Sequence, residues 1–259
     1  MPQNNKKPIV GIFVTCLIDL FRPQIAIATC QLLEQAGCRV IVPKTQSCCG
    51  QVNYNSGDFK GAAAITKPLL KAFEDVDYVV SPSGSCCAMI KHHLSELFSD
   101  ETLKIQAQTL AKKTFELSSF LVDILHFSFT HTASKQHKKQ YRYTYHDSCS
   151  GLRELGISQN PRLLLDQLGY LRRIEMKDSQ TCCGFGGTFC VKYPDISNHI
   201  VSQKIKNASE SQADLVLAGD LGCLLNMAGK ANRLKCKQRF FHYAEILAGM
   251  ADQAAILEP

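Results

Sequence analysis

The tripeptide Cys48-Cys49-Gly50 occurs a second time as Cys182-Cys183-Gly184, and each copy stands at the centre of a spaced series of cysteines. A single cysteine precedes each tripeptide and another follows it, at nearly equal intervals in the two halves of the chain. The series is completed by Cys16 and Cys86 in the first half and by Cys149 and Cys223 in the second. The order and spacing survive with only small insertions, so the chain is an internal repeat.

Hydrophobic runs and turn residues recur around these cysteines in the same order. Apolar, aromatic and β-branched runs indicate strands, while Gly37 and Gly169 end helical segments, the second of which opens near Pro161. Each half is therefore predicted to be β-α-β-α-β-α, with a parallel sheet flanked by helices, a fold of the α/β class. The expected strands are residues 9–14, 39–43, 78–80, 141–145, 171–176 and 215–217, and the expected helices are 24–36, 60–73, 103–125, 161–168 and 196–209.

This pattern predicts two cysteine-rich domains, residues 1–130 and 141–259, joined by a polar, basic linker at residues 131–140. In each domain the three cysteine positions follow the carboxyl ends of expected strands. Parallel α/β sheets bind their ligands in the crevice outside those ends. The cysteines of each half are therefore expected to converge on one site.

The composition limits the class of protein. The chain has 259 residues, is 45% hydrophobic and 20% charged, and carries a net charge of +6. These values are ordinary for a globular protein, and the mild charge excess does not predict nucleic-acid binding. No stretch approaches the ~18 continuous apolar residues of a membrane span. A chain able to build a core does not need disulfides, so its 13 cysteines indicate metal or redox groups in a reduced, cytoplasmic protein.

Each half offers four thiols, a donor set that suits a tetrahedral zinc ion or an iron–sulfur cluster. Adjacent cysteines tend to point apart, which strains them at one small ion, whereas a cluster of several irons leaves room for both. Glycine directly after each pair permits positive φ and a close approach of the backbone to an inorganic core. The pattern favours a cluster, and a zinc- or thiol-bearing scaffold protein is the alternative from another class.

The two series resemble the cysteine-rich CCG domain of heterodisulfide reductase B subunits and glycolate oxidase iron–sulfur subunits, and most closely the lactate utilization protein A family. The resemblance covers nearly the whole chain. It is carried by Cys16-Leu-Ile-Asp-Leu-Phe-Arg-Pro23, Cys48-Cys-Gly-Gln51, Tyr54-Asn-Ser-Gly57, Pro82-Ser-Gly-Ser-Cys86, His146-Asp-Ser-Cys-Ser-Gly-Leu-Arg-Glu-Leu155, Cys182-Cys-Gly-Phe-Gly-Gly-Thr-Phe189 and Asp220-Leu-Gly-Cys-Leu-Leu-Asn-Met-Ala-Gly229.

The resemblance implies an iron–sulfur electron-transfer subunit of a cytoplasmic complex that oxidises L-lactate to pyruvate. Such an oxidoreductase subunit is expected to act only with two other subunits, an iron–sulfur protein and a small accessory protein. One cluster per repeat, [4Fe-4S], is expected on four cysteines, because Met89 and Asn226 stand where heterodisulfide reductase relatives have a fifth. A heterodisulfide-reductase-like or glycolate-oxidase-like redox subunit is the alternative, since no residue distinguishes one small 2-hydroxy acid substrate from another.

Two side chains beside the second series are candidate catalytic residues. His146 lies just before that series, where it is placed to supply a proton or to orient a ligand, or else to cap the following turn. Arg153 and Arg22 follow equivalent cysteines. Each offers a guanidinium to a carboxylate substrate or to a cluster, or forms an ion pair with a helix carboxylate. Cys87 adjoins an expected ligand, but Leu224 stands at the equivalent place in the second half.

Overall fold

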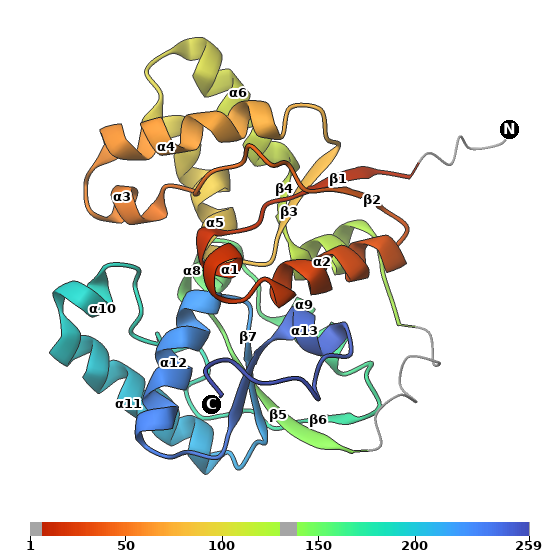
Figure 1. Cartoon of the computed structure of the whole chain (residues 1–259), viewed down its shortest axis with the longest axis vertical. Helices are drawn as coiled ribbons and strands as arrows, with labels where there is room; N and C mark the ends of the chain where they lie inside the picture. Colours follow the sequence, from red (N-terminus) through yellow and green to blue (C-terminus); the bar gives the residue numbers. More distant parts are fainter. Residues whose placement is uncertain (1–6, 130–138, 259) are drawn as a thin grey trace, which may run out of the picture.

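The computed structural model describes residues 7–129 and 139–258 and contains two four-stranded parallel sheets, one in each half of the chain (Figure 1). The first sheet has the strand order β2-β1-β3-β4 and the second has the order β6-β5-β7-β8. The predicted fold class, two tandem α/β repeats, is confirmed. The strands are β1 (Ile9–Ile12), β2 (Arg39–Ile41), β3 (Tyr78–Ser81), β4 (Thr114–Glu116), β5 (Tyr141–His146), β6 (Leu171–Arg173), β7 (Leu215–Ala218) and β8 (Arg239–His242).

Helices connect the strands, because parallel neighbours cannot be joined by a tight turn. The helices predicted at residues 24–36, 60–73, 161–168 and 196–209 are found as α2, α4, α9 and α11, with ends that differ by at most three residues. Short helices also begin at or near the lone cysteines. The α-helices are α1 (Cys16–Phe21), α2 (Gln24–Gln35), α3 (Gln51–Asn55), α4 (Phe59–Ala72), α5 (Gly84–Ala88), α6 (Glu101–Lys113), α7 (Leu117–Ser119), α8 (Cys149–Arg153), α9 (Gln159–Leu165), α10 (Phe189–Lys192), α11 (Pro194–Glu210), α12 (Leu221–Arg233) and α13 (Tyr243–Leu247).

Each sheet has one edge strand that the sequence pattern did not predict. The single helix expected at residues 103–125 is wrong, because α6 ends at Lys113 and strand β4 follows before α7 and a π-helical segment, Phe120–Ile124. Strand β4 has only three residues, too few to show an alternating pattern next to a strong helical one. Strand β8 at the matching edge of the second sheet was not predicted either.

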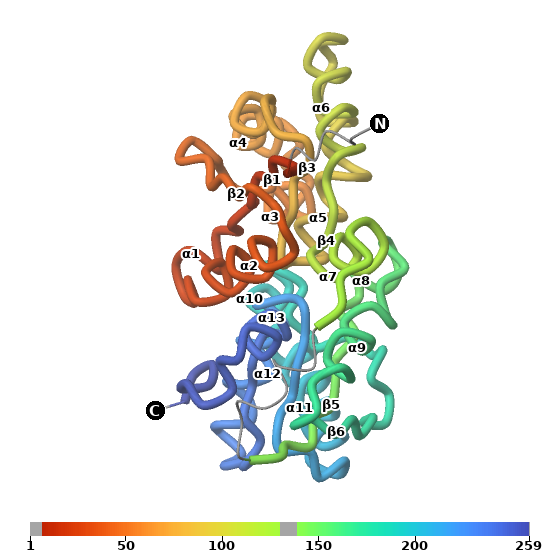
Figure 2. The backbone as a smooth tube through the Cα atoms, turned by 90° about the vertical axis from the view of Figure 1, so that its right-hand side faces the viewer, coloured from red at the N-terminus to blue at the C-terminus, as the bar shows by residue number. Residues whose placement is uncertain are grey.

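The two halves pack against each other through matching elements, stacked along the long axis of the molecule (Figure 2). Helix α2 packs against α13 and its counterpart α9 packs against α7, while α5 packs against α8 and α1 against α12. Each contact therefore recurs with the halves exchanged, as an approximate twofold rotation requires. One cluster of buried apolar side chains accordingly includes residues from both halves, among them Leu33, Phe120, Tyr143, Leu165 and Tyr243.

The predicted linker at residues 131–140 lies mostly outside the described residues, so the predicted domain boundaries stay a prediction. No helix within residues 7–129 and 139–258 combines the length and the apolar character needed to cross a membrane.

An ion pair joins the halves at one side of their junction. Arg22, just after α1, donates from Nε to Oε1 of Glu245 on α13 at 2.8 Å and from Nη2 to the Ala254 carbonyl at 2.6 Å. The Glu245 side chain is fully buried and that of Arg22 is 13% exposed. Arg22 is thus engaged with a helix carboxylate, one of the roles that the sequence left open.

We expect Arg22→Met to lower the free energy of unfolding by about 2–3 kcal/mol, because the variant leaves a buried carboxylate without its partner. Urea denaturation measures the loss. Arg142→Met is the matched control, since the side chains of the Arg142–Asp214 pair are 44% and 41% exposed and such pairs contribute less than about 1 kcal/mol. Equal losses in the two variants would contradict the role of Arg22 at the junction.

Candidate metal centre

Both cysteine series lie where the strand order of their sheet reverses. Strands β1 and β3 are neighbours, but the chain leads from β1 to β2 on one side and from β3 to β4 on the other. Such a reversal opens a crevice at the carboxyl ends of the strands. Cys16 begins α1 after β1, and Cys86 lies in the first turn of α5 after β3. Cys149 and Cys223 take the same places after β5 and β7.

In the first half the four thiols form two close pairs. The Sγ atoms of Cys48 and Cys16 are 3.7 Å apart, and those of Cys49 and Cys86 are 3.3 Å apart. Gly50, next to the pair, has a φ of +78°, and a Cβ there would lie 2.7 Å from a neighbouring side chain. The turn therefore requires glycine, which agrees with the prediction that glycine after the cysteine pair permits positive φ and a close approach of the backbone.

The second half repeats this arrangement. Cys149 is hydrogen-bonded to Cys182, and Cys183 to Cys223. Gly184 has a φ of +84°, and a Cβ on it would lie 2.8 Å from a backbone carbonyl oxygen. The structure thus brings together, within each half, the four cysteines that the sequence nominated.

All eight of these cysteines line one cavity of about 410 Å³ between the two halves. The sequence predicted one site per half and gave no sign that the two sites face each other. The twofold relation of the halves accounts for this, because it turns the carboxyl ends of both sheets toward the junction. The other walls of the cavity include the apolar side chains of Leu17, Val52, Phe185, Val191 and Leu221.

Hydrogen bonds join the halves directly beside the thiols. Ser83 and Asp220 are the equivalent residues before α5 and α12, and Ser83 Oγ donates to Asp220 Oδ1 at 2.6 Å. Ser85 Oγ donates to the same oxygen at 2.8 Å. Helices α5 and α8 cross so closely that a Cβ on Gly84 would lie 2.9 Å from the Cα of Gly151. The two thiol sets are therefore held in a fixed relation to each other.

Each half holds one thiol that ionises readily. The hydrogen bond from Cys16 lowers the pKa of Cys48 to about 2, and the bond from Cys149 lowers the pKa of Cys182 to about 2. The same hydrogen bonds, followed by burial, raise the pKa values of Cys16 and Cys149. The thiolate is the form of cysteine that binds metal ions.

The spacing of the four thiols in each half shows whether all four could surround a single ion. Four thiolates around one zinc ion, at Zn–S distances of about 2.3 Å, must lie within roughly 4 Å of one another. Among the described residues, the one group of three potential ligand atoms all within 4.8 Å of one another is His146, Cys183 and Cys223. No three thiols of either half are that close. The thiol sets therefore fit a group wider than one ion, such as a cluster of several irons.

The structure places only one of the two candidate catalytic side chains, His146 and Arg153, beside the thiols. His146 is the last residue of β5, is fully buried and lies beside Cys183 and Cys223. Burial and then the charge of Lys204 lower the pKa of His146 to about 3, so its imidazole is neutral. Arg153 ends α8, is exposed and does not line the cavity.

A polar network behind the second thiol set, buried except for Glu175, was not predicted from the sequence. Arg162 donates to the two carboxylate oxygens of Asp147 at 2.6 and 2.9 Å, and its Nε donates to Glu175 at 2.7 Å. Lys204 Nζ donates to the carbonyl of Asp178 at 2.5 Å. In the sequence these side chains cannot be told from the charged residues of a solvated helix or loop. Only Asp147, two residues before Cys149, had a position that indicated a role near the thiols.

The five remaining cysteines do not line the cavity. The Sγ of Cys87 is buried and lies 3.8 Å from the Ser81 carbonyl oxygen, which it faces. The others are Cys30, Cys38, Cys190 and Cys236.

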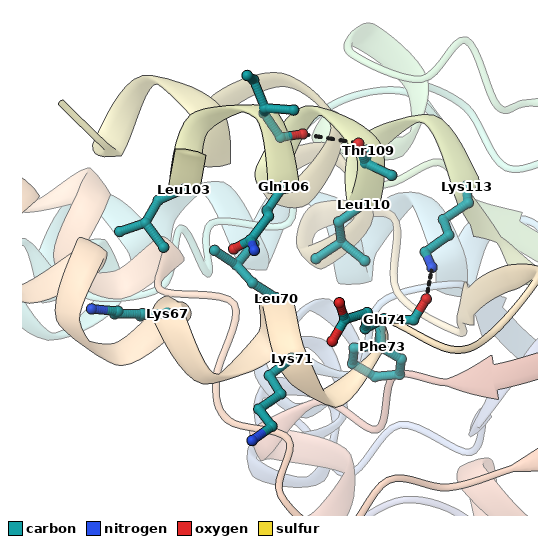
Figure 3. Close-up of a pocket in the computed structure, with 11 residues that line it drawn as sticks. Lys67, Leu70, Lys71, Phe73, Glu74, Leu103, Gln106, Thr109, Leu110 and Lys113 are labelled. Atoms are coloured by element: carbon teal, nitrogen blue, oxygen red, sulfur yellow. Dashed lines mark hydrogen bonds between the residues drawn. The ribbon is translucent and has the colours of Figure 1, made fainter. Parts of the chain in front are cut away.

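A second cavity, of about 390 Å³, lies between α4 and α6 of the first half (Figure 3). Its lining includes Lys67, Lys71 and Lys113, with no cysteine or histidine among the described residues of its walls. Lys113 Nζ is already bound, because it donates to the Glu74 and Val76 carbonyls at 2.9 Å each. This cavity offers none of the thiol chemistry found between the halves.

Fold and site together define a cysteine-rich protein with two copies of one domain, and the cysteine-rich domain family, CCG, matches residues 10–91 and 143–228. The chain is 44% identical to lactate utilization protein A of Geobacillus kaustophilus over 92% of this chain and 98% of that protein. It is 41% identical to lactate utilization protein A of Halalkalibacterium halodurans, over 92% of this chain and 96% of that protein. The chain belongs to the lactate utilization protein A family, as the resemblance of its motifs predicted.

Among solved structures, a hypothetical protein from Helicobacter pylori is similar in fold, with a TM-score of 0.62 over 96% of this chain and 14% sequence identity. This chain spans 52% of that protein. At this identity the likeness extends to the fold alone.

Proposed function

We propose that this chain is an iron–sulfur electron-transfer subunit of a cytoplasmic complex that oxidises L-lactate to pyruvate. The observation that carries the proposal is the single cavity lined by all eight cysteines of the two repeats. The relatives are named lactate utilization proteins, which supports the substrate, and the letter A in that name suits one component of several.

The proposal assigns one cluster, [4Fe-4S], to each repeat. When bound, such a cluster accepts and releases single electrons. This chain's residues hold the ligands in place: Asn226 Nδ2, for example, donates to the Cys183 carbonyl at 2.9 Å and fixes the loop that carries the adjacent thiols. The ligands of the first cluster are Cys16, Cys48, Cys49 and Cys86, and those of the second are Cys149, Cys182, Cys183 and Cys223.

The rim of the cavity is the place where partner subunits would approach. Cys16 is exposed there, whereas Cys49 and Cys183 at the inner ends are 3% and 2% exposed. Val191 and Val52 line the cavity and are 79% and 46% exposed. Exposed apolar side chains grouped around one opening suit a protein contact. The proposed partners are a second iron–sulfur protein and a small accessory protein.

We expect lactate oxidation to require those partners, because the sequence has no complete dinucleotide-binding fingerprint and lactate gives up two electrons. The test mixes the anaerobically reconstituted chain with L-lactate, with and without the two partner subunits, and follows bleaching of the visible cluster band. The expected result is bleaching only when both partners are present. Glycolate serves as a parallel substrate. Bleaching by glycolate but not by lactate would favour the glycolate-oxidase-like alternative. Bleaching by lactate without the partners would contradict the proposal that lactate oxidation requires them.

A further inference from the structure

The two repeats differ at one buried position beside their thiols. The residue three places before the first cysteine is Phe13 in the first half and His146 in the second. Both side chains are fully buried. Phe13 packs edge-on against Phe73, with ring centroids 6.1 Å apart, and needs no polar partner. His146 places two ring nitrogens at the equivalent position, and apolar packing alone does not provide them with hydrogen-bond or metal partners.

Neither ring nitrogen of His146 makes a well-aligned hydrogen bond within the described part of the chain. The nearby Ser179 carbonyl raises the pKa of the imidazole somewhat, but this oxygen already accepts from the Asp147 amide and from Lys204 Nζ. A buried polar group left in this state destabilises the folded protein, so native proteins rarely keep one without a use for it. Within 4.8 Å of a ring nitrogen lie the Sγ atoms of Cys183 and Cys223, and these three potential ligand atoms form one compact group.

The charged groups behind the second thiol set are already engaged with other partners. Lys204 Nζ donates to the backbone carbonyls of Asp178 and Ser179 at 2.5 and 3.2 Å. Both oxygens of Asp147 accept from Arg162, and one also accepts from Ser179 Oγ at 3.1 Å. The imidazole therefore has thiols on one side and occupied polar groups on the other.

We propose that His146 supplies a ring nitrogen as an additional ligand to the metal group held by the second set of thiols, an inference that rests on the proposed function. The second site then has mixed nitrogen and sulfur ligands, whereas the first, with Phe13 in the equivalent place, is ligated by thiolates alone. Neutral imidazole is a common metal ligand. A histidine ligand in place of a thiolate raises the reduction potential of an iron–sulfur centre, so the second centre is expected to have a higher potential than it would have with a thiolate at position 146.

Pulsed electron paramagnetic resonance of the full chain, reconstituted anaerobically with iron and sulfide and partly reduced with dithionite, tests the ligand directly. Samples are prepared with natural and with ¹⁵N-labelled histidine. The expected spectrum has nitrogen couplings of a bound imidazole in one of the two cluster signals, at frequencies that change with the label. His146→Phe, which installs the residue of the first repeat, is expected to lose these couplings. His199→Phe, at an exposed position of α11, is expected to keep them.

His146→Cys provides a second variant, because a thiol at this position can replace the imidazole as a ligand. It is expected to retain iron and sulfide, to lose the histidine couplings and to shift one of the two reduction potentials downward. Spectra that do not change with ¹⁵N-histidine, from protein that holds iron and sulfide, would overturn this inference and leave the proposed function standing. Protein that takes up no iron and sulfide at all would overturn both.

Discussion

Cys183→Ser is expected to lower the iron content of the anaerobically reconstituted protein from about eight to about four atoms per chain, if each repeat holds a four-iron cluster. Cys183 is 2% exposed and lies between Cys182 and Cys223, to both of which it is hydrogen-bonded. A serine hydroxyl is a poor substitute for a thiolate that must bind iron. The first set of thiols comes entirely from the other half of the chain, so its cluster is expected to remain.

Cys236→Ser is the matched control. Cys236 is half-buried, lies outside the cavity and has the Ser209 hydroxyl as its neighbour at 3.7 Å. This variant is expected to keep all of its iron, as measured by the same metal and sulfide analysis. Loss of half the iron in Cys236→Ser, or full iron in Cys183→Ser, would show that the thiols of the cavity have been assigned wrongly.

Gly84→Ala is expected to lower the free energy of unfolding by about 2 kcal/mol and to reduce iron binding in both repeats. The new Cβ would lie 2.9 Å from the Cα and 3.2 Å from the amide nitrogen of Gly151, two backbone atoms that cannot turn aside. Helices α5 and α8 must therefore move apart, and they carry Cys86 and Cys149 with them. The gain in helix propensity of about 1 kcal/mol from alanine does not offset this overlap.

Gly229→Ala is the control for Gly84→Ala, because both glycines lie in helices but a Cβ has room only at Gly229. A Cβ on Gly229 would meet a single atom, a methyl of Leu257 at 3.8 Å, which is ordinary contact. Its expected effect on unfolding is a gain of up to about 1 kcal/mol, with unchanged iron content. Urea denaturation and iron analysis of both variants decide the matter. Equal stability of the two would contradict the tight crossing of the halves.

Much of the fold could be predicted because the same pattern of cysteines and hydrophobic runs occurs twice in the chain. The spacing around Cys48-Cys49-Gly50 and its second copy indicated the repeat, and the strand runs before Cys16 and Cys149 gave the parallel sheets. The edge strands were missed because their signal is local and weak. Residues 114–116 adjoin the strong helical pattern of α6, and tertiary pairing with β3 decides their state.

The candidate site was predicted only in part, for a different reason. Convergence of four cysteines within a half follows from the rule that ligands bind at the carboxyl ends of parallel strands. The meeting of both sets in one cavity depends on how the halves pack, through contacts such as Ser83 with Asp220. The hydrophobic periodicity of the sequence does not indicate which residues form such contacts. The same limit applies to His146, whose burial and lack of a well-aligned hydrogen bond are properties of the fold.

The central claim is that the eight thiols of the cavity hold iron–sulfur clusters, and the metal content of anaerobically purified protein tests it most directly. Iron, zinc and acid-labile sulfide are measured together, with a visible spectrum before and after dithionite. The expected result is iron and sulfide in equal amounts, about eight of each per chain, with a visible band that dithionite bleaches. Zinc without sulfide, and no band to bleach, would contradict it and favour the scaffold protein instead.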